Sequence, residues 1–190
     1  AKIVVRGLVD SMGVIDELTL AGTIDELEDA LPLHILNLSL GGYLRQPFLY
    51  TKDGRTELTI RDRRVQPGGL PAVAAAIEKL RRTCFERHGI RLVVVAAAGN
   101  NGKDTPFYPA ALPSVIGVGA LNQDYSKVIW SNYGHWVDAW EIGSDVVSSF
   151  VGADLRVRGG GGDGKDGAIW GGTSFAAPRL AGRLAAAMTV

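Results

Sequence analysis

The sequence predicts an α/β fold in which a mainly parallel sheet lies between two layers of helices. The apolar runs ILNLSL (35–40) and RLVVVAAAG (91–99) have the length and composition of strands that are buried on both faces. Segments with helical spacing of apolar residues alternate with such runs, and this alternation favours parallel strands with helices on both faces of the sheet. The 190 residues suffice for a single domain with a sizeable core.

The amino-terminal part predicts a strand, a helix and a second strand. KIVVRGLV (2–9) is rich in β-branched residues, which are typical of strands. Thr23 and Glu26 have the spacing of a capping box, so we expect a helix to begin at Thr23 and to end before Pro32. The run ILNLSL follows and ends in two glycines, as a buried strand does before a loop.

Residues 43–68 form an additional segment, and further helices and strands follow it. Within this segment, FLYTKDGRTELTI predicts a β-hairpin that turns at Asp53-Gly54. A second helix is expected to begin at Pro71 and to end with a C-cap at Gly89. The further strand candidates are SVIGVGA (114–120), HWVDAW (135–140) and DVVSSF (145–150). After the glycine-rich loop 159–167, the chain is expected to end in a helix with an apolar stripe.

The composition argues against several classes of partner. Twenty basic and twenty acidic side chains give no net charge, so neither a nucleic acid nor an anionic membrane is an expected partner. The longest apolar runs are too short to span a bilayer. Cys84 is the single cysteine, so a disulfide within the chain is excluded and the cellular compartment stays open.

Three polar, glycine-containing stretches are expected at the carboxyl edge of the sheet, where α/β folds form their sites. They are SLGG (39–42), AAGNNG (97–102) and GGTSFAAP (171–178). The backbone N–H of Ser174, at a helix N-terminus, and the Asn100 side chain could both donate hydrogen bonds to one developing oxyanion. Taken singly, Ser174 also suits an N-cap and Asn100 a turn, and these simpler interpretations stay open.

Four stretches of the chain resemble, in order, sequence blocks of the subtilisin-like serine proteases. They are ILNLSLGG, VVVAAAGNNG, YPAALPSVIGVGA and GGTSFAAPRLAG. The resemblance covers nearly the whole chain apart from residues 43–68. It implies the subtilisin-like fold, peptide or protein substrates, and no required cofactor. Family members commonly bind calcium and are commonly secreted, although no distinctive ligand cluster stands in this sequence.

The resemblance also implies roles for single residues. Ser174 corresponds to the nucleophile, Asn100 to the side-chain donor of the oxyanion hole, and Thr173 to a residue that supports the turn at Ser174. A substrate is expected to lie between two walls of the P1 pocket, which receives the side chain before the cleaved bond. These walls would be formed by Ser39, Leu40 and Gly41 on one side, and by Ala97, Ala98 and Gly99 on the other. Phe107 corresponds to the floor of this pocket, where its ring would favour small substrate side chains.

The histidine that would activate Ser174 is not expected within residues 1–190. His34 precedes a strand of six residues, so it would lie about 20 Å from the carboxyl edge. His88 ends a helix, His135 precedes a strand, and neither stands in a family histidine block. Asp10 lies in VDSMG, where Met12 breaks the match to the family aspartate motif. We therefore expect the carboxyl-terminal two-thirds of a catalytic domain, incomplete on its amino-terminal side and inactive without an upstream segment that carries the aspartate and histidine.

Two departures from the family pattern and two alternative functions complete the prediction. DAWEIG (138–143) replaces a usual apolar–Ala-Pro-Gly turn, and Arg179 stands where a histidine is common. GGGGDGK (159–165) fits the core of a phosphate-binding loop, but Asp166 replaces the hydroxyl residue that holds Mg²⁺. A non-catalytic scaffold or binding module on a protease fold is the other alternative, because the residues that would decide are expected upstream.

Overall fold

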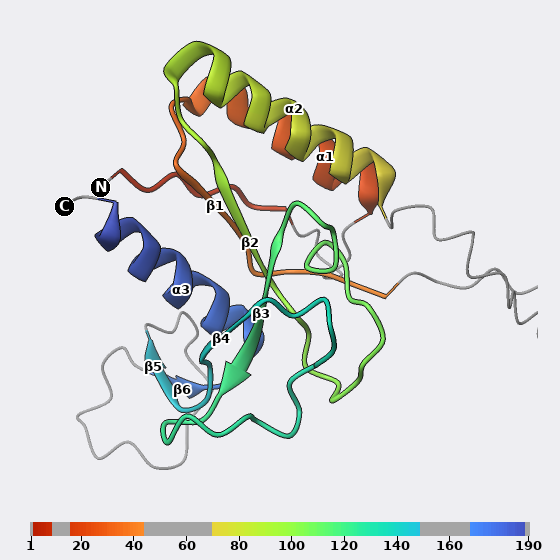
Figure 1. The fold of residues 1–190 in the computed structure, drawn as a ribbon, viewed down its shortest axis with the longest axis vertical. Coiled ribbons are helices and arrows are strands. Elements are labelled where there is room, and N and C mark those ends of the chain that lie inside the picture. The colour runs from red at the N-terminus through yellow and green to blue at the C-terminus, as the bar shows by residue number, and fades with distance from the viewer. Residues whose placement is uncertain (1, 9–15, 44–69, 149–167, 189–190) are drawn as a thin grey trace, which may run out of the picture.

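The computed structural model describes residues 2–8, 16–43, 70–148 and 168–188. In these ranges a parallel sheet with the order β1-β2-β3-β4 lies between α1 and α2 on one face and α3 on the other (Figure 1). The strands are β1 (Ile35–Leu38), β2 (Val93–Ala97), β3 (Ile116–Leu121) and β4 (Ala139–Ile142). The helices are α1 (Glu17–Glu26), α2 (Pro71–His88) and α3 (Thr173–Ala187), with a 3₁₀ turn at Leu27–Ala30. The predicted α/β class and parallel sheet are confirmed.

The central strand β2 explains how the sheet is covered on both faces. Successive side chains of a strand point to opposite faces. Val94 and Ala96 accordingly pack in the core under α1 and α2, whereas Val95 and Ala97 pack in a second core under α3. Alanines on both sides of the second core, such as Ala177 on α3, let helix and sheet approach closely.

The first helix begins earlier than predicted, and the capping box at Thr23 is wrong. The Asp16 carboxylate caps α1 by accepting a hydrogen bond from the backbone N–H of Thr19 at 2.9 Å. The hydroxyl and N–H of Thr19 together hold the pKa of Asp16 below its ordinary value. Thr23 lies inside the helix and donates to the Thr19 carbonyl instead. Aspartate caps helices as well as threonine does, and burial of Leu20 favours the earlier start.

The predicted strand at residues 2–9 is also wrong over residues 2–8, which form neither helix nor strand. Ile3 and Val5 are 84% and 79% exposed. A β-branched composition favours extended backbone, but a strand needs a neighbour to complete its hydrogen bonds, and none of the described strands pairs with this segment. Residue 9, Asp10, the hairpin at 48–60 and the loop at 159–167 lie outside the described ranges.

The remaining elements follow the prediction with shifted boundaries. The helix α2 begins at Pro71, and Gly89 ends it in the left-handed conformation with φ of 69°. The strands predicted at 135–140 and 145–150 form as β4 and as β5 (Val146–Ser148). β5 pairs antiparallel with β6 (Ala168–Trp170), a strand that the sequence did not predict. No helix of the described ranges is long and apolar enough to cross a membrane.

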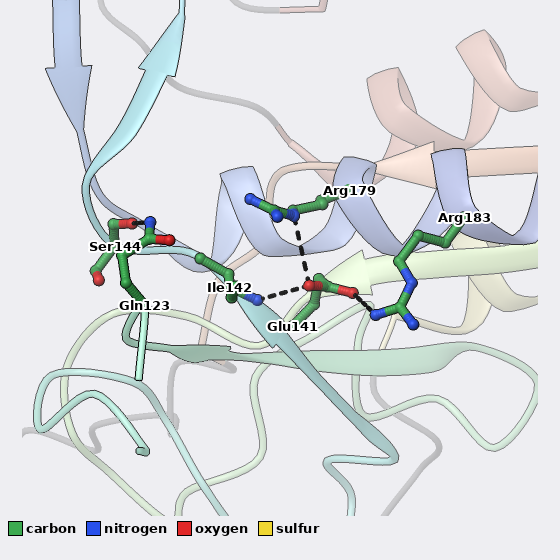
Figure 2. A network of polar contacts seen from close by, with 6 residues as sticks. All are labelled: Gln123, Glu141, Ile142, Ser144, Arg179 and Arg183. Atoms are coloured by element: carbon green, nitrogen blue, oxygen red, sulfur yellow. Dashed lines mark hydrogen bonds and ion pairs between the residues drawn. The ribbon is translucent and has the colours of Figure 1, made fainter. Parts of the chain in front are cut away.

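A polar cluster joins β4 to α3 on the same face of the sheet. The Glu141 side chain is 3% exposed, and Figure 2 shows Arg179 and Arg183 reaching toward it from α3. Arg183 Nη1 lies 2.7 Å from Glu141 Oε2, and the N–H of Ile142 donates to Oε1 at 2.9 Å. Burial by itself raises the pKa of Glu141, but the Ile142 bond and both arginines outweigh it. The pKa therefore lies below its ordinary value.

Candidate active site

Three segments meet at the carboxyl edge of the sheet and enclose a pocket of about 270 Å³. They are the residues after β1, the loop after β2 and the first turn of α3. The lining residues are Leu40, Gly41, Ala97, Gly99, Asn100, Asn101, Phe107, Thr173 and Ser174. The structure thus brings most of the sequence-predicted site residues to one pocket. Ser39 and Ala98 do not line the pocket: the Ser39 hydroxyl donates a hydrogen bond to the Ser174 carbonyl, and Ala98 is fully buried.

The amide of Asn100 is held in one orientation by Thr173. Asn100 Oδ1 accepts a hydrogen bond from the Thr173 backbone N–H at 2.8 Å and another from its hydroxyl at 2.9 Å. A backbone N–H can only donate, so the atom facing it must be the amide oxygen. The two hydrogens on Asn100 Nδ2 have no partner among the described residues. Asn100 therefore offers a donor beside Ser174, with which it lines the pocket.

Thr173 ties the loop after β2 to the start of α3. Its side chain is fully buried, and its hydroxyl accepts a hydrogen bond from the Gly99 N–H at 3.0 Å while donating to Asn100. The Thr173 hydroxyl therefore both accepts and donates a hydrogen bond within the protein. Because Thr173 is the first residue of α3, these bonds fix the Asn100 side chain relative to the positive end of the helix dipole.

Ser174 is held on its other side by the segment after β1. In an α-helix the Ser174 carbonyl would accept from the N–H of residue 178, but Pro178 has no N–H. The Ser39 hydroxyl donates to this carbonyl at 2.9 Å instead. Ser39 Oγ in turn accepts from Asn37 Nδ2 at 2.9 Å, which directs its proton toward Ser174. The sequence marked Ser39 only for its place in a substrate-binding segment.

Asn132 organises the loop that carries Asn100, and sequence reasoning missed it. It is fully buried, and its Oδ1 accepts from the N–H groups of Asn101 at 3.0 Å and Lys103 at 3.2 Å. Its Nδ2 donates to the carbonyl of Ala98 at 2.8 Å and to the hydroxyl of Tyr43 at 2.9 Å. All four hydrogen-bonding capacities of the amide are therefore used. The available signal was an asparagine in the polar stretch SNYG (131–134), which looks like an ordinary turn.

Phe107 lies between the two walls of the pocket. A Cβ added to Gly41 would overlap Phe107 Cε1, and one added to Gly99 would lie 3.0 Å from Phe107 Cγ. The ring therefore packs directly on the backbone of both glycines. Gly99 is fixed as glycine for a second reason, because its φ of 97° is unfavourable for other residues.

None of the three histidines lines this pocket. The carbonyl of His34 accepts from the Val93 N–H at the amino ends of β1 and β2, which is the opposite edge of the sheet. His88 is the last residue of α2, and His135 is exposed in the loop before β4. In the described ranges no group of three or more His, Cys, Asp or Glu side chains is placed to hold a metal ion.

Comparisons with known proteins bear on the family and the fold of this chain. A thermophilic serine proteinase of Bacillus sp. (strain AK1) is 44% identical over 90 residues, which are 47% of this chain and 20% of that protein. The solved structure of the patellamide maturation protease PatA is 27% identical with a TM-score of 0.60, covering 91% of this chain and 50% of that one. A cold-adapted subtilisin-like serine proteinase shares the fold, at 20% identity and a TM-score of 0.61, covering 92% of this chain and 49% of that one. This chain thus spans about half the length of the solved relatives. The family model described as the subtilase family matches residues 1–190, and the chain therefore belongs to that family.

Proposed function

We propose that this chain is the carboxyl-terminal part of the catalytic domain of a serine endopeptidase, with Ser174 as the nucleophile. The Asn100 side chain and the Ser174 N–H act as the oxyanion hole. One observation carries this proposal: Thr173 holds the oxygen of Asn100, so that the Nδ2 donor is left beside Ser174 in one pocket. Asn132, which is fully buried, instead uses its amide donor within the protein.

In the proposed reaction, Ser174 Oγ attacks the carbonyl carbon of a peptide bond while a base takes the hydroxyl proton. The carbonyl oxygen becomes an anion, which accepts hydrogen bonds from Asn100 Nδ2 and the Ser174 N–H. The N-terminal end of α3 adds a favourable dipole at the same place. The leaving amine takes the proton from the base, and water then hydrolyses the acyl-serine by the same steps.

The base and its aspartate are proposed to come from a segment outside residues 1–190, either upstream in the same polypeptide or in a separate chain. Two features of the described residues support this. β1 ends the described sheet with an unpaired side, which offers a place for a further strand. Ile3 and Val5 expose apolar side chains that such a segment would cover. The alternative is a non-catalytic member of the family that retains the serine pocket as a binding site.

The test is active-site labelling with a fluorophosphonate in the protein assembled with its Asp- and His-bearing segment. We expect one label on Ser174, located by mass spectrometry, and hydrolysis of a casein substrate. Ser174→Ala should abolish both, while the matched control Ser148→Ala, exposed on β5, should change neither. Persistent labelling of Ser174→Ala would remove Ser174 as the nucleophile. An assembled, folded protein that neither labels nor hydrolyses would support the non-catalytic alternative.

A further inference from the structure

We propose that an aromatic pair, Phe107 with Tyr43, closes the P1 pocket and restricts it to small side chains such as those of glycine, alanine and serine. This inference rests on the proposed function, since it names the substrate class of the same site. Tyr43 enters it from the structure alone, because no sequence pattern connects residue 43 with residue 107. Phe107 fills the space beside Ser174, and Tyr43 prevents it from leaving.

Phe107 lies between two backbone segments that are held by hydrogen bonds. Its ring lies on the backbone of Gly41 and of Gly99, which are the two walls of the pocket. The Gly41 wall is fixed by the neighbouring bridge, in which Gly42 and Tyr108 exchange hydrogen bonds of 2.8 and 2.9 Å. The Gly99 wall is fixed by the bond from its N–H to Thr173. These hydrogen bonds oppose any spreading of the walls that would make room for a larger substrate side chain.

Tyr43 closes the remaining way out for the Phe107 ring. The two rings meet edge to face, with centroids 5.0 Å apart and an angle of 75° between their planes, a favourable geometry for aromatic pairs. The Tyr43 hydroxyl donates to Asn101 Oδ1 at 3.1 Å and accepts from Asn132 Nδ2 at 2.9 Å. The ammonium of Lys103 lies 5.5 Å from the centre of the Tyr43 ring. Displacing Phe107 would require Tyr43 to break these contacts.

The free energy needed to displace Phe107 determines how strongly the pocket prefers small substrate side chains to large ones. The pocket volume of about 270 Å³ extends from Leu40 to Ser174, so it must also hold the main chain of the substrate. Because the Phe107 ring lines this volume together with Ser174, we expect a methyl group to enter beside the ring and an aromatic or branched side chain to require its displacement. One methylene in a closely fitting pocket changes selectivity by roughly 10- to 200-fold. We therefore expect a preference of at least about tenfold for alanine over phenylalanine.

The test measures binding of product-like peptides to the protein assembled with its Asp- and His-bearing segment, so that the readout is binding and does not depend on a catalytic rate. The probes are acetyl-Ala-Ala-Ala-Ala and acetyl-Ala-Ala-Ala-Phe with free carboxylates, titrated against the isotope-labelled protein by NMR. We expect the alanine peptide to bind at least about tenfold more tightly. Phe107→Ala should raise the affinity for the phenylalanine peptide by about tenfold or more. Tyr43→Ala should also raise the affinity for the phenylalanine peptide. Tyr43→Phe, which keeps the ring but loses the hydroxyl, should raise that affinity less than Tyr43→Ala does.

The matched control is Phe85→Ala, because Phe85 is 54% exposed on α2 and does not line the pocket. It should leave both affinities unchanged. If both peptides bind and the phenylalanine peptide binds as well as the alanine peptide, the inference is overturned while the proposed function stands. If neither peptide perturbs the resonances of Gly41, Gly99 and Ser174 in the folded protein, the pocket is no peptide site and both proposals fall.

Discussion

Removing the Ser39 hydroxyl should destabilise the first turn of α3 only because residue 178 is a proline. The Ser174 carbonyl has lost its helical donor to Pro178, and the Ser39 hydroxyl at 2.9 Å replaces that donor. Ser39→Ala leaves the carbonyl to water. Pro178→Ala restores a backbone N–H at the position where an α-helix supplies one. In the Pro178→Ala background the hydrogen bond from Ser39 is redundant. Adding Ser39→Ala to it should therefore lower the free energy of unfolding only slightly.

The magnitude follows from the geometry of this one bond. A neutral hydrogen bond contributes a net ~0.5–1.5 kcal/mol, and an acceptor left without any partner costs about 1–3 kcal/mol. Ser39 is exposed, so water can reach the Ser174 carbonyl and the lower range applies. We expect Ser39→Ala to lower the free energy of unfolding by about 1 kcal/mol. With Pro178→Ala present the loss should fall below about 0.3 kcal/mol, which gives a coupling of roughly 0.7 kcal/mol.

The assay is urea unfolding of the four proteins of this cycle, followed by tryptophan fluorescence, with Ser148→Ala as an exposed serine control. The rate of fluorophosphonate labelling at Ser174 provides a second readout in the assembled enzyme. That rate should fall in Ser39→Ala and recover in the double variant. An equal loss of stability from Ser39→Ala in both backgrounds would refute the reasoning, since Pro178 would then have no part in the role of Ser39.

Four further substitutions, one of them a control on an open helix surface, test the site and its support. Asn100→Ala should lower kcat of the assembled enzyme by roughly 10²–10³, the loss known for removal of an oxyanion-hole donor in subtilisin, with little change in KM; an unchanged kcat contradicts the assignment. Gly99→Ala should destabilise the fold by at least ~2 kcal/mol in urea unfolding, because its φ is 97° and its Cβ would lie 2.5 Å from Asn132 Nδ2. Gly22→Ala, on an open helix surface, should instead stabilise by about 0.5–1 kcal/mol. Glu141→Gln should destabilise the protein at pH 7; since the folded pKa of Glu141 lies below its ordinary value, this difference should be present above about pH 4.5 and disappear as the pH falls through the folded pKa. A pH-independent difference would mean that the Glu141 charge does not contribute.

The fold was largely predictable because its determinants are local. Val93 to Ala97 form a short apolar run that suits a strand buried on both faces, and Pro71 and Gly89 mark the two ends of a helix. The start of α1 was not predictable in the same way, since Asp16 and Thr23 are both suitable N-caps. Only the packing of Leu20 against the core decides between them. The antiparallel strand β6 has three residues and no pattern of its own, because its pairing with β5 defines it.

The candidate site, like the fold, was predictable only in part. Ser174, Asn100 and Thr173 lie in stretches whose glycines and small residues resemble known blocks, so the sequence could nominate them. Their hydrogen bonds depend on which atoms meet across the chain, and the bond between Asn100 and Thr173 joins residues 73 positions apart. Asn132 and Tyr43 were missed because their importance comes from partners on other loops. A residue whose role is to satisfy distant backbone groups leaves no pattern near itself in the sequence.

The two departures from the family pattern acquire a meaning once they are seen together. The sequence showed DAWEIG (138–143), which contains Glu141, in place of a usual apolar–Ala-Pro-Gly turn, and separately Arg179 where a histidine is common. In the structure these positions face each other, and Arg179 Nε lies 3.5 Å from Glu141 Oε1 (Figure 2). A buried carboxylate without a cation would be strongly unfavourable, so Glu141 requires the positive charges on α3. Arg179 and Arg183 are 47% and 70% exposed and could stand alone in water. Glu141 therefore depends on the two arginines more than they depend on it. Replacing both Arg179 and Arg183 by alanine should lower the free energy of unfolding, measured in urea, more than Glu141→Gln does.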